Sequence, residues 1–69
     1  MPAMTMDEAV ERSLEALRAD PRHDGSWDEE RAWRHIRDVT GIRDPARDGY
    51  LRQVADRVQL AVEAPPPRP

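Results

Sequence analysis

Two Asp-Pro dipeptides, Asp20-Pro21 and Asp44-Pro45, divide the chain into three segments and constrain its fold more than any other feature. The residue before a proline is pushed out of helical geometry, whereas proline itself is favoured in the first turn of a helix. The first dipeptide is therefore expected to end one helix, and the second to open another with Asp44 as its N-cap. Both belong to the pattern D-P-x-x-D-G, but the flanking residues do not align. The pattern thus predicts a turn used twice rather than a repeat array.

The three segments carry apolar residues at the spacing of amphipathic helices. They predict helices over residues 6–19, 27–40 and 46–63, which together form an all-α three-helix bundle. The residues expected to face the core are Met6, Ala9, Val10, Ser13, Leu14, Leu17, Trp33, Ile36, Val39 or Thr40, Tyr50, Leu51, Val54, Ala55, Val58, Ala61 and Val62. This domain covers residues 1–64, and the proline-rich residues 65–69 are expected to form a disordered tail or the start of a linker.

Capping residues mark the ends of the first two predicted helices. Thr5 with Glu8, and Ser26 with Glu29, each match a capping box, in which two side chains satisfy amides of the first helical turn. Gly41 is placed to end the second helix in the left-handed conformation that closes many helices. The sequence therefore predicts both the starts and the stops of these helices.

The chain is short and only modestly apolar, which limits its core. It has 69 residues, with four Leu, two Ile, five Val and no Phe. A bundle of this size and composition is close to balance when isolated, so we expect it to gain stability from a partner or from self-association.

The sequence favours a cytoplasmic protein. It contains no cysteine, and no apolar run approaches the length needed to span a membrane. The segment from Met1 to Glu11 has acidic residues where a secretory signal would be basic. We therefore expect no membrane association.

No group of residues has the spacing of a catalytic or metal site. The D-P-x-x-D-G turns match part of an EF-hand loop, but the twelfth position, which needs Glu, holds Arg31 in one copy and Ala55 in the other. His23 and His35 lack the spacing of a helical zinc site, and His35 is expected to face solvent. We therefore expect no enzyme activity, no metal or other cofactor, and no small-molecule substrate.

The second and third predicted helices resemble the centre of a helix-turn-helix unit, with Gly41 as the turn glycine. The apolar positions of that motif hold Ile36, Ile42 and Tyr50. However, Arg37 and Arg47 stand where the motif needs a small and a buried aliphatic residue, and Asp44 and Asp48 would face the DNA phosphates. A DNA-binding regulator that uses the third helix is thus the alternative function, and nucleic acid is not the partner we expect.

The junction between the first two predicted helices is similar to one found in small addiction-module antitoxins, where a D-P turn leads into a Ser-Trp-acidic-acidic helix start. The corresponding residues are Leu17-Arg18-Ala19-Asp20-Pro21 and Ser26-Trp27-Asp28-Glu29-Glu30. The resemblance covers about a seventh of the chain, with residues that helix capping alone also favours. It implies an acidic helical inhibitor that docks on a partner.

Two large apolar residues have no place in the predicted core. Leu60 lies off the main stripe of the third helix, and Trp27 lies on the first turn of the second. We expect them to form the centre of a partner-binding surface rimmed by Arg31, Arg34 and Arg57, because aromatic and arginine residues dominate interface hot spots. The predicted function is a non-catalytic protein–protein interaction module that binds a protein partner or forms a homodimer. A regulator, an antitoxin-like inhibitor and an accessory subunit all fit this description.

Overall fold

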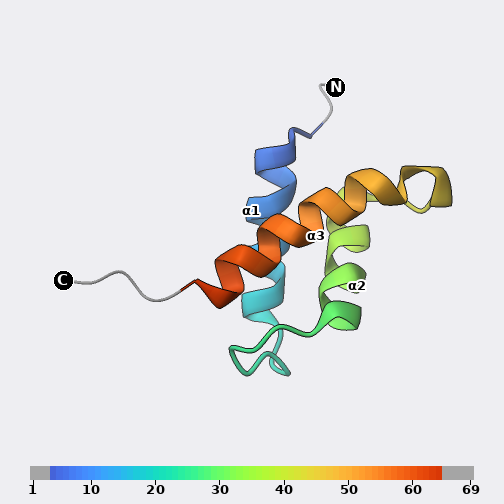
Figure 1. Cartoon of the computed structure of the whole chain (residues 1–69). Helices are drawn as coiled ribbons and strands as arrows, with labels where there is room; N and C mark the ends of the chain where they lie inside the picture. Colours follow the sequence, from blue (N-terminus) through green and yellow to red (C-terminus); the bar gives the residue numbers. More distant parts are fainter. Residues whose placement is uncertain (1–3, 65–69) are drawn as a thin grey trace.

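The structure is a computed structural model that describes residues 4–64, and this part of the chain folds into three α-helices and one short 3-10 helix (Figure 1). The elements are α1 (Met6–Ala19), α2 (Glu29–Thr40), η1 (Pro45–Arg47) and α3 (Asp48–Glu63). No strand occurs in the described part of the chain, and the predicted all-α three-helix fold is confirmed. The proline-rich residues 65–69, predicted to be a tail, lie outside the described residues.

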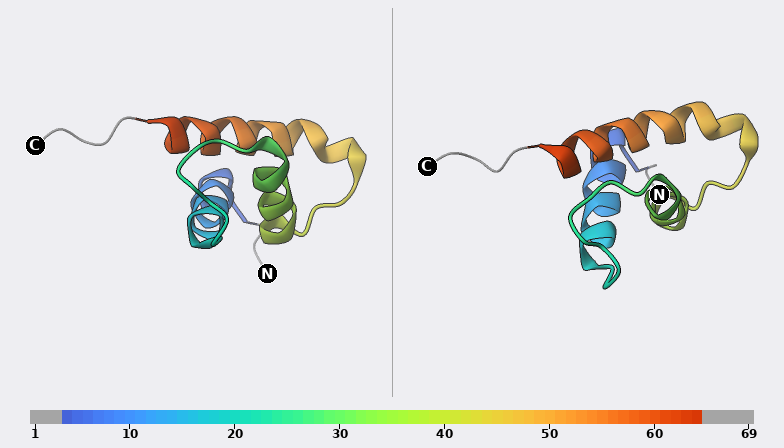
Figure 2. Two further views of the ribbon diagram at one scale, coloured as in Figure 1. Left: turned by 90° about the horizontal axis from the view of Figure 1, so that it is seen from below. Right: turned by 60° about the horizontal axis from the view of Figure 1, so that its bottom comes forward.

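The three helices form two layers. Helices α1 and α2 lie side by side, and α3 crosses both of them on one side of the pair (Figure 2). Each helix contacts the other two. The core therefore lies between α3 and the α1–α2 pair. Among residues 4–64, no helix combines the length and the apolar character that crossing a membrane requires.

Helix α1 begins and ends where the sequence predicts. The Thr5 side chain accepts a hydrogen bond from the Glu8 amide at 3.1 Å, as an N-cap should. The Glu8 carboxylate in turn accepts a bond from the Thr5 hydroxyl at 3.4 Å. At the other end, the extended backbone of Asp20 stops the helix, and its amide donates to the Leu17 carbonyl at 3.1 Å.

Helix α2 begins two residues later than predicted, because Ser26 is not its cap. Gly25 has a φ of +93°, and the Ser26 amide donates to the Asp24 carboxylate at 2.9 Å, so Ser26 belongs to a tight Asx turn. Asp28 caps the helix instead and accepts a bond from the Arg31 amide at 3.1 Å. The predicted capping box of Ser26 with Glu29 is therefore wrong.

The other end of α2 matches its prediction. Gly41 adopts a left-handed conformation with φ of +70°, and its amide donates to the Arg37 carbonyl at 2.8 Å. Only glycine takes this conformation without steric cost, so the residue that ends α2 is fixed by the sequence.

Helix α3 also begins two residues later than predicted, since a 3-10 turn precedes it. Asp44 caps η1 rather than α3, and its side chain accepts a bond from the Ala46 amide at 3.0 Å. Pro45 supplies the fixed φ that suits a first turn, but three residues of 3-10 geometry follow before α3 starts at Asp48. Asp44-Pro45 thus opens the helical segment as expected, but the α-helix itself begins at Asp48 rather than at residue 46.

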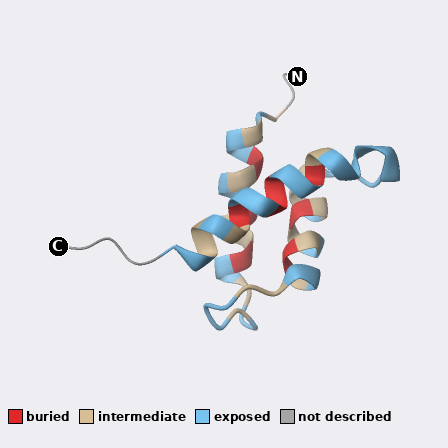
Figure 3. Ribbon diagram, in the orientation of Figure 1, coloured by how far each residue is buried: buried red, intermediate tan, exposed pale blue. Residues whose placement is uncertain are grey.

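The core is small and almost entirely aliphatic. Its buried residues lie on the inner faces of all three helices (Figure 3). They are Ala9, Leu17, Ala32, Ile36, Leu51, Val54, Ala55 and Val58. Most of them belong to the predicted stripes. Ser13, also on a predicted stripe, is buried as well. The other residues expected in the core are only half-buried, namely Met6, Val10, Leu14, Trp33, Val39, Thr40, Tyr50, Ala61 and Val62.

Candidate functional site

Two of the predicted partner-binding residues, Trp27 and Arg31, lie at the junction of α1 and α2. Trp27 precedes α2 and packs, half-buried, against the core. The Arg31 guanidinium donates to the Arg22 carbonyl at 3.0 Å and pairs with Asp28 at 3.8 Å and Asp20 at 3.9 Å. Only 25% of the Arg31 side chain is exposed. These contacts hold the junction together. They occupy much of the hydrogen-bonding and ion-pairing capacity of the Arg31 guanidinium within the chain.

His35 belongs to the same junction, which corrects the expectation that it faces solvent. Its Nε2 atom lies 2.8 Å from Asp20 Oδ2, and only 22% of its side chain is exposed. The prediction failed because it placed His35 relative to Trp33 on a single helix, whereas Asp20, at the end of α1, covers this flank of α2. The pKa of Asp20 is held below its usual range, first by the bond from the Arg22 amide and then by the bond with His35.

The remaining predicted residues are Arg34 on α2, and Arg57 and Leu60 on α3. Arg34 is exposed and forms an ion pair with Glu30 at 3.9 Å, one helical turn away. The Arg57 guanidinium donates to the Gln53 carbonyl at 3.2 Å. Leu60 is 72% exposed and stands on the outer face of α3, opposite the buried face.

The structure therefore divides the five predicted residues into two groups. Trp27, Arg31 and Arg34 lie together near the start of α2, where the two arginines line a shallow polar hollow with Arg22, Asp28 and Glu30. Arg57 and Leu60 stand one turn apart on α3. Among residues 4–64, no hydrogen bond or ion pair joins one group to the other. A single binding surface formed by all five residues stays a prediction.

A different group of residues gathers around Trp33. The guanidinium carbon of Arg37 lies 5.1 Å from the centre of the Trp33 ring, and that of Arg52, from α3, lies 5.9 Å from it. Both distances are within the range of a cation–π interaction. Within the described part of the chain, neither guanidinium forms an ion pair with a carboxylate. We call Trp33, Arg37 and Arg52 the Trp33 surface.

Sequence reasoning missed the Trp33 surface for a specific reason. Trp33 falls on the apolar stripe of α2, so its spacing predicts a core position, and it does pack against the core while staying partly exposed. Arg37 follows it by one helical turn, which was a usable sign of a stacked guanidinium. Arg52 belongs to another helix, and only the packing of α3 on α2 brings it to the same ring.

A second aromatic ring carries a guanidinium near the start of α3. Arg47 lies 5.5 Å from the centre of the Tyr50 ring, beside a shallow hollow. The hollow is lined by Met4, Thr40, Ile42, Arg47 and Tyr50. The Thr40 hydroxyl is already engaged, since it donates to the Ile36 carbonyl at 2.8 Å and accepts from the Ile42 amide at 3.3 Å. This hollow offers one cation but no convergent set of polar groups.

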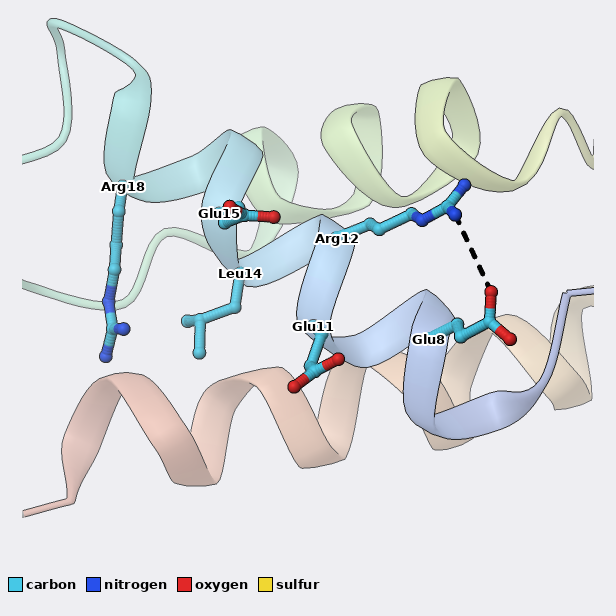
Figure 4. Close-up of a pocket in the computed structure, with 6 residues that line it drawn as sticks. All are labelled: Glu8, Glu11, Arg12, Leu14, Glu15 and Arg18. Carbon is cyan, nitrogen blue, oxygen red and sulfur yellow. Dashed lines mark ion pairs between the residues drawn. The ribbon is translucent and has the colours of Figure 1, made fainter.

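A larger, open groove runs along the outer side of α1 (Figure 4). It is lined by Glu8, Glu11, Arg12, Leu14, Glu15 and Arg18. Arg12 reaches back to Glu8 at 3.6 Å, whereas Glu11 and Leu14 point toward α3 in Figure 4. Among residues 4–64, Glu11 and Glu15 form no ion pair. The groove therefore presents free carboxylates beside a partly exposed leucine.

Residues 4–64 bring no three His, Asp or Glu side chains close enough together to hold a metal ion. No protein-family model, curated protein or solved structure matches the chain. The local chemistry of its surfaces is therefore what supports a functional proposal.

Proposed function

We propose that this protein is a non-catalytic protein–protein interaction module that recognises its partner through the Trp33 surface. The observation that carries the proposal is the pairing of one partly buried tryptophan with two arginines that have no carboxylate partner among residues 4–64. Tryptophan and arginine are the residue types that contribute most often to interface hot spots. Ring stacking also holds both guanidiniums in place before a partner arrives, which lowers the entropy lost on binding.

The Trp33 surface is better suited to this role than the Leu60 group. A single exposed leucine is ordinary on a folded protein, and Arg57 already donates to the backbone of its own helix. Trp27 and Arg31 serve the α1–α2 junction. The proposed binding surface is therefore centred on Trp33 rather than on Trp27 and Leu60.

The biological role that fits such a module is a cytoplasmic regulator, an inhibitor of the antitoxin kind or an accessory subunit. Each of these roles needs a small domain that docks on another protein and performs no chemistry itself. Recognition of DNA by α3 is less favoured, because its exposed face alternates Arg52 and Arg57 with Asp56 and Glu63. A DNA-reading helix needs a predominantly basic face.

Two matched variants test the proposal, because α3 offers two exposed arginines of which only one touches Trp33. Proteins retained by the immobilised chain, including further copies of itself, are identified by mass spectrometry, and the best-retained protein is purified. Its affinity for the wild-type chain, Arg52→Glu and Arg57→Glu is then measured by calorimetry. We expect Arg52→Glu to weaken binding at least about tenfold and Arg57→Glu to change it less than about twofold. Equal effects of the two variants, or no retained protein at all, would contradict the proposal.

A further inference from the structure

We infer that the partner of the Trp33 surface is a second copy of this chain, which docks one edge of its α1 helix there. This inference rests on the proposed function, since it names the occupant of the same surface. The edge consists of Glu11, Leu14 and Glu15, which line the open groove of α1. We call these three residues the α1 edge.

The charges of the two surfaces are complementary. The Trp33 surface has two guanidiniums, and the α1 edge has two carboxylates. None of these four groups forms an ion pair among residues 4–64. Elsewhere in that range some carboxylates and arginines do pair, as Glu8 does with Arg12, while others, among them Arg18 in the same groove, form no ion pair. The two surfaces thus leave opposite charges free on the same molecule.

The spacing of the charges is compatible with this pairing. Glu11 and Glu15 stand one helical turn apart, which places their Cβ atoms about 5 to 6 Å from each other. The guanidinium carbons of Arg37 and Arg52 lie 5.1 and 5.9 Å from one ring centre, so they are at most about 11 Å apart. Flexible Glu and Arg side chains span the remaining difference. Each carboxylate of one copy can therefore meet one guanidinium of the other.

An apolar contact completes the match. Leu14 is only partly buried and stands on the α1 edge beside Glu11 (Figure 4). Trp33 is likewise partly buried, and the guanidinium carbons of its two arginines lie 5.1 and 5.9 Å from the ring centre. Leucine against tryptophan gives the contact an apolar centre with a charged rim, which is the usual arrangement of a protein interface. Every copy carries both surfaces. The α1 edge of one copy can therefore dock on a second copy while its own Trp33 surface binds the α1 edge of another copy.

Charge reversal provides a test with the protein itself as the probe. Sedimentation equilibrium is run on the wild-type chain, on Arg52→Glu, on Glu15→Arg, and on an equal mixture of the two variants. The wild-type chain should associate, and each variant alone should associate at least about tenfold more weakly, because like charges then face each other. The mixture should regain association, since each altered surface meets a surface of opposite charge on the other variant. Circular dichroism confirms that each variant keeps its helix content.

Arg57→Glu is the matched control and should associate like the wild-type chain. The pair Arg37→Glu with Glu11→Arg gives a second test of the same pairing and should behave in the same way. The inference is overturned if the wild-type chain stays monomeric, if the single variants associate as tightly as the wild type, or if the mixture fails to recover. A monomeric wild-type chain whose different bound protein is lost in Arg52→Glu would overturn the second copy as the occupant and leave the proposed function standing.

Discussion

His35 Nε2 lies 2.8 Å from Asp20 Oδ2, and this contact joins the middle of α2 to the residue that ends α1. Asp20 also accepts a bond from the Arg22 amide at 2.9 Å and lies 3.9 Å from the Arg31 guanidinium. The backbone of Asp20 therefore ends α1, while its carboxylate bonds the turn that follows and contacts α2. These contacts join the two helices on which α3 packs.

Stability should depend on pH through this junction. The pKa of Asp20 lies below its usual value of 3.8, first because of the bond from the Arg22 amide and then because of His35. With a depressed pKa, the folded state binds fewer protons than the unfolded state near pH 4, so the stabilisation is complete above that pH and is lost as the pH falls further. We expect the free energy of unfolding to decrease between about pH 5 and about pH 2, as followed by urea titrations.

The variant Asp20→Asn should be less stable than the wild type at neutral pH and should show a smaller loss on acidification. Asn retains the size of the side chain but not the charge that favours the Arg31 contact. The exposed Asp56 on α3 supplies the control, because Asp56→Asn should leave the pH dependence as it is in the wild type. An unchanged acid slope in Asp20→Asn would show that other carboxylates carry the effect.

The start of α2 can be tested by removing one capping side chain at a time. Asp28→Ala should lower the free energy of unfolding by about 1 kcal/mol, because the Arg31 amide loses its acceptor. Ser26→Ala should cost clearly less, since Ser26 bonds to Asp24 in the turn and caps no helix. Urea denaturation of both variants decides the matter, and a larger cost for Ser26→Ala would restore the helix start that the sequence predicts.

Sequence and structure agree best where a single residue type decides the local geometry. Thr5 opens α1, Asp20 ends it and Gly41 ends α2, each by a short-range interaction that the sequence already contains. The start of α2 was misplaced because two candidate caps compete there, and the start of α3 because a 3-10 turn precedes it. Asp28 displaces Ser26 as cap, and a 3-10 turn forms before Asp48.

The candidate site was harder to predict than the fold because it depends on contacts between helices. Periodicity within α2 indicates that Trp33 packs on the core, and it cannot show that Arg52 comes from α3 to cover the same ring. In the same way, nothing local to α2 reveals that His35 meets Asp20. The sequence therefore favoured Trp27 for the interface, because Trp33 falls on the stripe expected to face the core.

Ser13 offers a stability test inside the core. It is fully buried on α1, and its hydroxyl has no hydrogen-bond partner among residues 4–64. A buried, unpaired hydroxyl is unfavourable, and alanine also favours the helix more than serine does. We expect Ser13→Ala to raise the free energy of unfolding by about 1 kcal/mol in urea denaturation. A clear loss of stability would mean that the Ser13 hydroxyl makes a favourable contact in solution.

Truncation of the two leucines on α3 should lower the free energy of unfolding by very different amounts. Leu51 is fully buried between the helices, so Leu51→Ala should cost about 3 kcal/mol. Leu60 is 72% exposed, so Leu60→Ala should stay within about 0.5 kcal/mol of the wild type. Thermal denaturation followed by circular dichroism at low concentration compares them. A large cost for Leu60→Ala under those conditions would place Leu60 in a contact that the isolated fold does not make.

The most direct test of the Trp33 surface uses the two tryptophans of the chain, Trp27 and Trp33, as internal reporters. Their two indole N–H signals are followed by ¹⁵N-resolved NMR while the protein concentration is raised, with Trp27→Phe providing the assignment. Docking of a second copy predicts that the Trp33 signal shifts with concentration and that the Trp27 signal stays in place. A Trp33 signal that does not move over the same concentration range would contradict the docking of a second copy on the Trp33 surface.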